Sequence, residues 1–287
     1  MSDYTALKTP LLGDLKRLFS ASRQTITVIS PFLSRFGLQT LQESVCQNQG
    51  NLQVTILTCV SVRNLSAGSM DIDALSEFCR AFPNSRVRNL PGLHAKVYIA
   101  DLCEAIVTSA NLTRGGLVGN YEYGIRITEA RPVSAIHKDM IEYSGLGAGL
   151  EAADLLQLAD ATKELRAAAR TNEKVFRTSS AWKKLSGKVN QLEESLLRQR
   201  VRGTSVNSVF ADTVRYLLRS GPMRTQDLEA RVQGTHPDMC DDAIDRVIDG
   251  VHFGKKWKHM VRNTQQFLAR RGEIEYCKSD RTWRLVR

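Results

Sequence analysis

The chain has 287 residues, of which 42% are hydrophobic, a composition typical of a globular protein with room for about two domains. Its formal net charge of +10 and isoelectric point of about 9.5 favour a partner with negative charge, such as nucleic acid. The N-terminal segment lacks the basic-then-apolar form of a signal peptide, and no apolar run approaches membrane-spanning length, so we expect a cytoplasmic protein with no membrane partner.

The first 130 residues alternate between strand-like and helix-like patterns. Runs of β-branched and apolar residues predict strands at 26–32, 52–60, 86–90, 95–100, 105–109 and 121–128. Apolar residues at helical spacing predict helices at 38–48 and 71–82. This order indicates an α/β fold, with a mixed β-sheet flanked by helices. The polar segment 61–70 is expected to be a connection, either an ordinary one or a loop that faces substrate.

Chemically active side chains gather around the strands predicted at 95–100 and 105–109. Residues two apart share one face of a strand, so His94 and Lys96 in the run H-A-K-V-Y-I-A-D project together. The run T-S-A-N places Ser109 and Asn111 on one face of the next strand, across a short hairpin loop. Two neighbouring strand ends can therefore present an imidazole, an ammonium, a hydroxyl and a carboxamide to one spot.

This set of side chains suits phosphoryl transfer. The histidine can attack phosphorus or protonate a leaving oxygen, because the pKa of imidazole lies near neutrality. Lys96, Ser109 and Asn111 can donate hydrogen bonds to the non-bridging oxygens as charge builds there. Glu122, in the run N-Y-E-Y, can accept a hydrogen bond from the far ring nitrogen of His94 and hold its tautomer. Asp101 stands at a strand end, where a hydrogen bond from it would fix the loop.

Neither a metal nor a cofactor is expected, because lysine and imidazolium can carry the positive charge that this chemistry requires. The six cysteines include no C-x-x-C pair, and several stand in apolar segments. They are typical of buried thiols in a reducing compartment rather than of a disulfide or zinc framework.

The spacing H-x-K-x4-D, followed after six residues by a small residue and S-x-N, resembles the HKD motif of the phospholipase D superfamily. The resemblance extends from about residue 23 to 128 and is greatest to the nuclease branch, where H-A-K, S-A-N-L-T and N-x-E-x-G recur together. Thr108 departs from the family, which usually has glycine there. The resemblance implies two HKD motifs that meet across a twofold or pseudo-twofold axis. One histidine forms a phosphohistidine, and the other protonates the leaving group and later activates water.

Only one copy of the motif is present in the sequence. None of the other histidines, at 137, 236, 252 and 259, has lysine two positions on and aspartate five positions after that. The string at 137–139, H-K-D, has the wrong spacing and is interpreted as a polar helix face. We therefore predict a homodimer in which two His94 residues face each other across a twofold axis.

The middle of the chain is predicted to be helical. A glycine-rich segment at 143–150 breaks the preceding pattern, as a hinge or a helix end would, and two amphipathic helices follow at 151–170 and 183–200. Their apolar stripes suit core or dimer contacts. We assign 1–145 to a phospholipase D-like catalytic domain and 146–204 to a helical linker or dimerisation region.

The last third has the pattern of a separate small domain. Helices are predicted at 209–219, 225–232, 241–249 and 255–271, with Thr225 as an N-cap and Gly272 as the stop of the last helix. Strands at 273–276 and 282–286 are expected to pair as a hairpin. This order resembles a winged helix, which implies a DNA-binding domain over 205–287.

Positive charge concentrates in the same region. From residue 251 onward there are ten lysines and arginines against three acids, an excess of seven positive charges. A basic helix of this kind can enter a major groove while cations on a hairpin reach phosphates. The candidate DNA contacts are Lys255, Lys256, Lys258, Arg262, Arg270, Arg271, Lys278 and Arg281. The alternative is a winged helix that contacts protein.

Three functions remain in competition. The first is a metal-independent DNA endonuclease, with restriction and phage defence as candidate roles. The second is a phospholipid phosphodiesterase or transferase of the same superfamily, although no apolar membrane-facing or targeting segment is visible. The third is a DNA-binding protein with a vestigial site, against which the intact His94, Lys96 and Asn111 count.

Overall fold

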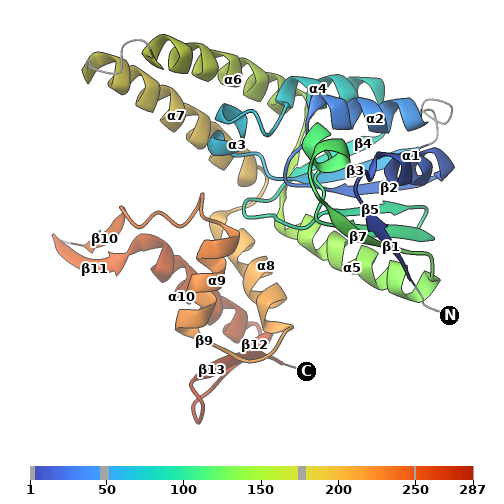
Figure 1. Ribbon diagram of the computed structural model, residues 1–287. Helices are drawn as coiled ribbons and strands as arrows, with labels where there is room; N and C mark the ends of the chain where they lie inside the picture. The colour runs from blue at the N-terminus through green and yellow to red at the C-terminus, as the bar shows by residue number, and fades with distance from the viewer. Residues whose placement is uncertain (1–3, 46–51, 174–178, 249, 287) are drawn as a thin grey trace. The chain divides into compact units, whose positions relative to one another are not determined.

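The computed structural model describes residues 4–45, 52–173, 179–248 and 250–286, and its chain divides into two units. Unit 1 covers Met1–Arg200 and unit 2 covers Val201–Arg287 (Figure 1). No helix in the described ranges is both long and apolar enough to cross a bilayer. Each unit has its own cluster of buried hydrophobic side chains.

Unit 1 is built on an eight-stranded mixed sheet with the order β1-β7-β6-β5-β2-β3-β4-β8. Its strands are β1 (Tyr4–Lys8), β2 (Thr25–Ile29), β3 (Gln53–Thr58), β4 (Ser85–Asn89), β5 (Val97–Ala100), β6 (Glu104–Thr108), β7 (Tyr123–Ile127) and β8 (Ala148–Leu150). Strands β2, β3 and β4 pair in parallel, and every other neighbouring pair is antiparallel. The predicted α/β class with a mixed sheet is thus confirmed.

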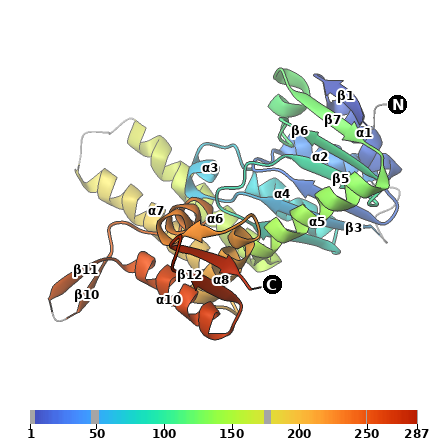
Figure 2. The same ribbon diagram turned by 90° about the horizontal axis from the view of Figure 1, so that it is seen from below.

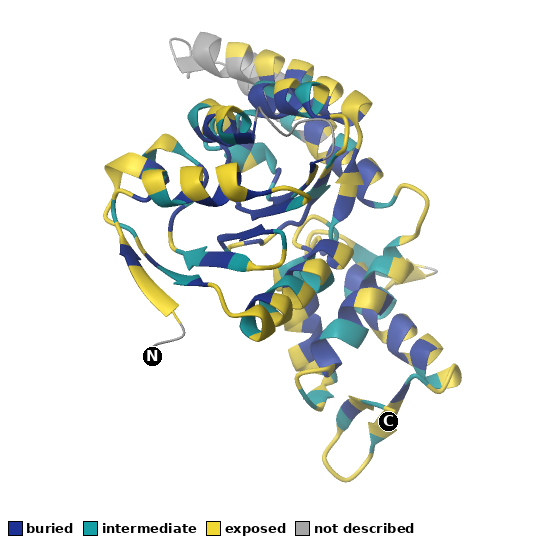
Figure 3. Cartoon of the chain, turned by 90° about the vertical axis from the view of Figure 1, so that its right-hand side faces the viewer, coloured by how far each residue is buried: buried dark blue, intermediate teal, exposed yellow. Residues whose placement is uncertain are grey.

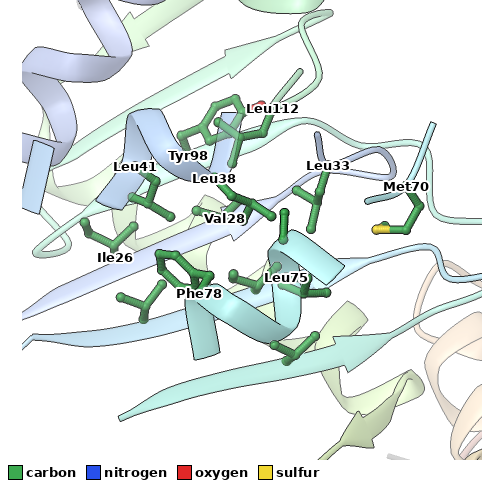
Figure 4. Close-up of a cluster of buried hydrophobic side chains, with 14 of the residues drawn as sticks. Ile26, Val28, Leu33, Leu38, Leu41, Met70, Leu75, Phe78, Tyr98 and Leu112 are labelled. Atoms are coloured by element: carbon green, nitrogen blue, oxygen red, sulfur yellow. The ribbon is translucent and has the colours of Figure 1, made fainter. Parts of the chain in front are cut away.

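Helices cover both faces of this sheet (Figures 1 and 2). Helices α1 (Leu12–Ala21), α2 (Arg35–Val45) and α4 (Ile72–Ala81) lie on one face, and α5 (Ala130–Leu146) lies on the other. The central strands are therefore buried on both faces, as the dark strands of Figure 3 show. Ile26 and Val28 of β2 join the cluster under α2 and α4, together with Phe78 of α4 and Tyr98 of β5 (Figure 4).

Several elements of unit 1 were not predicted. They are strand β1, which pairs with β7 at the edge of the sheet, helix α1, which packs against β5, and strand β8 at the opposite edge. Helix α5 contains the helix face interpreted at 137–139 and continues through the start of the glycine-rich segment. The expected loop at 61–70 contains the short helix α3 (Val62–Ser66), because Ser61 Oγ accepts the N–H of Asn64 at 3.2 Å and caps it. The predicted end of the helix at 38–48 lies outside the described residues.

Most of the region predicted as a linker is part of unit 1. Helices α6 (Ala152–Glu173) and α7 (Ser179–Arg200) contact each other, and α6 contacts α4. Leu155 and Leu158 of α6 and Leu192 and Leu196 of α7 are buried in the same core as the sheet. These side chains are therefore already buried by contacts within one chain. A dimerisation role for the region stays a prediction.

Unit 2 contains three longer helices and two small antiparallel sheets. In chain order its elements are α8 (Val206–Leu218), β9 (Met223–Arg224), α9 (Thr225–Thr235), β10 (Asp245–Ile248), β11 (Val251–Lys255), α10 (Lys256–Arg270), β12 (Ile274–Cys277) and β13 (Thr282–Leu285). Strands β12, β13 and β9 form one sheet in that order, and β10 pairs with β11. The hairpin after α10 is as predicted, and Gly272, with φ +70°, follows the end of that helix.

Two sequence predictions in unit 2 are wrong. The segment predicted as a helix at 241–249 forms the first strand of the β10–β11 hairpin, whose turn contains Gly250 with φ +77°. Residue 249 itself lies outside the described residues. Thr225 is not an N-cap, because Arg224 holds that position and Thr225 is already helical. The Thr225 hydroxyl instead accepts a hydrogen bond from Trp283 Nε1 at 3.0 Å, so it joins α9 to the sheet.

Candidate active site

His94 and Lys96 lie in an extended segment directly before β5, which begins at Val97 rather than at 95. The backbone N–H of Thr108 donates to Lys96 O at 3.1 Å, so pairing with the β6 side of the hairpin continues past the end of the strand. Lys96 Nζ lies 3.2 Å from His94 Nε2 and donates to His94 O at 2.7 Å. The expectation that the two side chains project together is confirmed.

The surroundings of these two side chains differ. His94 is exposed, whereas Lys96 is only 7% exposed. Burial lowers the pKa of the Lys96 ammonium, and the negative charge of Glu122 acts in the opposite direction. While Lys96 is protonated it can only donate, so His94 Nε2 accepts and the ring proton is assigned to Nδ1.

Ser109 and Glu122 meet at the next pair of strands, where β6 ends and β7 begins. The Ser109 hydroxyl donates a short hydrogen bond to Glu122 Oε2 and accepts the N–H of Tyr123 at 3.1 Å. Asn120 Nδ2 donates to the other carboxylate oxygen, Oε1, at 3.1 Å. No hydrogen bond joins Glu122 to His94 among the residues that the structure describes. The expectation that Glu122 holds the His94 ring is therefore not met within one chain.

Asn111 follows Ser109 by two residues, and its backbone oxygen is closely packed against the segment that follows. The N–H of Thr113 donates to Asn111 O at 2.7 Å, and a Cβ at Gly116 would lie 2.4 Å from that oxygen, so only glycine fits there. The Asn111 Oδ1 atom is buried and has no hydrogen-bond partner among the described residues. A buried amide end without a partner is unusual and suits a group that a ligand would complete.

Asp101 lies in the three-residue loop of the β5–β6 hairpin, where it and Leu102 have positive φ angles of 49° and 57°. Its carboxylate accepts the backbone N–H groups of Arg23, Gln24 and Thr25 at 2.7–2.8 Å. Burial acts against the charged form, but the hydrogen bonds from these N–H groups prevail and lower the pKa of Asp101. Asp101 thus ties the hairpin loop to the start of β2, as the sequence predicted.

Thr108, where the superfamily resemblance leads us to expect glycine, has a structural role in this chain. Its hydroxyl donates to Tyr123 O at 2.9 Å and accepts the N–H of Ala110 at 3.2 Å. The partner on β7 is Gly124, where a Cβ would lie 2.7 Å from Thr108 Cβ. The threonine side chain therefore fills the space that a side chain at 124 would need, and it leaves Ser109 in place.

Supporting residues that sequence reasoning missed come from distant parts of the chain. The buried Tyr98 hydroxyl donates to Ala110 O at 2.9 Å, and Ser30 Oγ accepts the N–H of Leu112 at 2.9 Å. Thr9 is bonded to the backbone on both sides of the loop that carries Glu122. The alternation of His94, Lys96 and Tyr98 was visible in the sequence, but no local signal marked Ser30 or Thr9.

Half of the candidate DNA-contact side chains in unit 2 are engaged with acids of the same unit. The ion pairs are Lys255 with Asp245 at 2.9 Å, Lys258 and Arg262 with Glu229 at 3.7 and 2.8 Å, and Arg271 with Glu273 at 2.7 Å. Arg270 Nε donates to a backbone oxygen of its own helix at 3.3 Å. Lys256, Lys278 and Arg281 are exposed and form no ion pair within the described ranges, so they are the cations most available to a ligand.

No curated protein matches the sequence. Among solved structures, NucT from Helicobacter pylori shares 19% identity at a TM-score of 0.43, covering 51% of this chain and 98% of its own. Nuc from Salmonella typhimurium, a phospholipase D family member, shares 15% identity at 0.44, covering 52% and 97%. Phosphatidylserine synthase from Haemophilus influenzae Rd KW20 shares 16% at 0.45, covering 60% and 45%.

The family comparison concerns the part of unit 1 that carries the site. Residues 15–143 match the family model described as "Cardiolipin synthase, PLD-like domain". The matched segment contains His94, Lys96, Ser109, Asn111 and Glu122. The chain is therefore similar to this family over residues 15–143, the part that carries the candidate site.

Proposed function

We propose that the chain is a phosphodiesterase that cleaves DNA through a covalent intermediate on His94. The observation that carries the proposal is the 3.2 Å approach of Lys96 Nζ to His94 Nε2, with the ammonium buried and the imidazole exposed. An exposed ring nitrogen can reach phosphorus, while a nearby fixed ammonium can stabilise the charge that develops on the phosphoryl oxygens.

The reaction proceeds in two displacements. When substrate binds, Lys96 Nζ turns from His94 Nε2 to a non-bridging oxygen and frees the lone pair of the ring. Nε2 then attacks phosphorus, a bond forms between nitrogen and phosphorus, and the bond to the leaving oxygen breaks. That oxygen takes a proton from the His94 of a second copy of the chain, which enters this step as an imidazolium and leaves it neutral. The same second imidazole then accepts a proton from water, whose oxygen attacks phosphorus and releases His94. Lys96 and the amide of Asn111 donate to the non-bridging oxygens in both steps.

A second copy is part of the proposal because this sequence carries the motif once. One imidazole cannot act as nucleophile and protonate the leaving group in the same step. A twofold axis near His94 would supply the second ring and would bring two identical sets of side chains together. The buried Oδ1 of Asn111 is an acceptor without a donor among the described residues, which is consistent with a site that a donor from a partner chain completes.

The choice of DNA over lipid rests on unit 2. Apart from the inserted β10–β11 hairpin, its element order α8-β9-α9-α10-β12-β13, with the sheet order β12-β13-β9, supports our winged-helix interpretation. Among the candidate DNA contacts, the exposed cations with neither an ion pair nor a hydrogen bond in the described ranges lie at the start of α10, at Lys256, and around the β12–β13 turn, at Lys278 and Arg281. A helix end and a wing are the parts of such a fold that meet the groove and the phosphates.

The test uses full-length protein with plasmid DNA, a single-stranded oligonucleotide and phosphatidylglycerol vesicles, each in excess EDTA. DNA cleavage by the wild type that His94→Ala abolishes would support the proposal. The matched control is His137→Ala, the same substitution on α5, which should leave cleavage unchanged. Lipid turnover without DNA cleavage would support the phospholipid alternative, and DNA binding without turnover would overturn the enzymatic proposal.

A further inference from the structure

The loop that carries Glu122 is clamped by a residue from the opposite end of the domain's sequence. The N–H of Glu122 donates to Thr9 Oγ1 at 2.6 Å, and the Thr9 hydroxyl donates to Asn120 O at 2.7 Å. The Thr9 N–H also donates to Glu122 O at 3.2 Å. One threonine therefore binds the backbone on both sides of Tyr121 and fixes the path of the loop.

The second part of the clamp is Asn120, which acts on the carboxylate itself. Its Nδ2 donates to Glu122 Oε1 at 3.1 Å, while its backbone N–H donates to Gly115 O at 2.8 Å. Ser109 holds the other carboxylate oxygen. Both oxygens of Glu122 are thus held by hydrogen bonds, and the backbone that carries the carboxylate is fixed by Thr9.

We infer that Thr9 and Asn120 are positioning residues, which hold the Glu122 carboxylate beside Ser109 and within electrostatic reach of Lys96. This inference rests on the proposed function, because its consequence is the charge state of Lys96 during phosphodiester cleavage. Neither residue is expected to touch substrate. Each acts through Glu122, whose negative charge has to lie in one place if it is to support a buried ammonium.

Loosening the clamp is expected to lower the pKa of Lys96. Burial lowers the pKa of Lys96, and Glu122 partly offsets this effect. If the carboxylate moves away, its attraction weakens and the pKa of Lys96 falls further. Cleavage that requires the ammonium is lost as pH rises through that pKa. Loosening the clamp should therefore move the alkaline limb of the pH–rate profile to lower pH.

The experiment compares Thr9→Val and Asn120→Ala with the wild type, using bis(p-nitrophenyl) phosphate as the substrate. We expect kcat to fall about tenfold to a hundredfold, as for a small misplacement of a catalytic group. The alkaline limb should move to lower pH. Thr9→Ser keeps the hydroxyl and should restore the wild-type profile. The control is Thr5→Val, the same substitution at an exposed position of β1, which should change nothing.

A second readout does not depend on activity. The pH titration of the side-chain NMR resonance of Lys96, assigned with Lys96→Arg, reports the pKa of its ammonium directly. The inference would be overturned if the wild type is active and both folded variants keep its alkaline limb of the pH–rate profile and its Lys96 pKa. An inactive wild type whose Lys96 pKa still falls in Thr9→Val would instead contradict the proposed function. Asn120 is exposed, so Asn120→Ala keeps the test open should Thr9→Val fail to fold.

Discussion

Arg262 is expected to stabilise unit 2 rather than to act mainly as a DNA contact. Glu229 is 4% exposed, and Arg262 Nε lies 2.8 Å from one of its oxygens, with Lys258 Nζ 3.7 Å from the other. Arg262→Met removes the nearer cation and leaves the buried carboxylate with the weaker partner. Loss of one member of a fully buried ion pair costs about 3–5 kcal/mol.

The expected cost is smaller here, because the Arg262 side chain is half exposed and Lys258 remains. We expect the free energy of unfolding to fall by about 1–2 kcal/mol. Urea unfolding of the full-length protein, followed by the fluorescence of the core residues Trp257 and Trp283, would measure it. Adding Glu229→Gln to Arg262→Met should recover most of the loss, because no buried charge is then left without its partner.

The matched control is Lys256→Met, at an exposed lysine with no ion pair within the described ranges. Its free energy of unfolding should change by less than about 0.5 kcal/mol. Its affinity for duplex DNA, measured by fluorescence anisotropy over a salt series, should fall, with the salt slope reduced by about 1. Equal stability of the Arg262→Met and Lys256→Met proteins would refute the role assigned to Arg262.

Three further predictions concern unit 1. Gly37→Ala would place a Cβ 2.0 Å from Leu112 O, next to the site, so it should lower both stability and activity. The control is Gly13→Ala, which has open space around it and should stabilise its helix by about 0.5–1 kcal/mol in thermal unfolding. The pKa of Asp101 is lowered in the folded chain, so its charged form adds to the free energy of unfolding above pH about 4. This stabilisation is lost as pH falls through the folded pKa. Asp101→Asn should remove that pH dependence from the free energy of unfolding. The alkaline limb of kcat/KM should lie below the usual lysine value of 10.5, and Lys96→Arg, whose side chain stays charged, should lose that limb.

Short-range sequence patterns were enough to predict the β5–β6 hairpin and the reactive side chains around it. Alternating residues in the run from His94 to Tyr98, the loop at Asp101 and the S-A-N run at Ser109 are all short-range features, and their geometry follows from the pleat of a strand. The Nζ–Nε2 approach of Lys96 and His94 follows from this alternation. The clamp on Glu122 could not be found in the same way, because Thr9 is 113 residues away and meets it only through the pairing of β1 with β7.

The hairpin β10–β11 shows how a local pattern can mislead. Ile244, Val247, Ile248 and Val251 have the spacing of one helix face, although the helix predicted at 241–249 does not form. In the structure all four side chains are at least 42% exposed, so burial in a hydrophobic core does not stabilise a helix there. Gly250, with its positive φ, forms the turn of a hairpin instead. Positive charge was misleading as well, because the sequence does not reveal that Glu229 lies against Arg262, 33 residues further along.

The central claim is that one site requires His94 from two chains. Wild-type and His94→Ala chains with different affinity tags can be co-expressed and purified on both tags in succession, which isolates the mixed dimer. We predict that this dimer cleaves DNA in EDTA at a rate about a hundredfold or more below a doubly tagged wild-type dimer. A mixed dimer that keeps half of the wild-type rate, or the recovery of active protein only as monomers, would contradict the account.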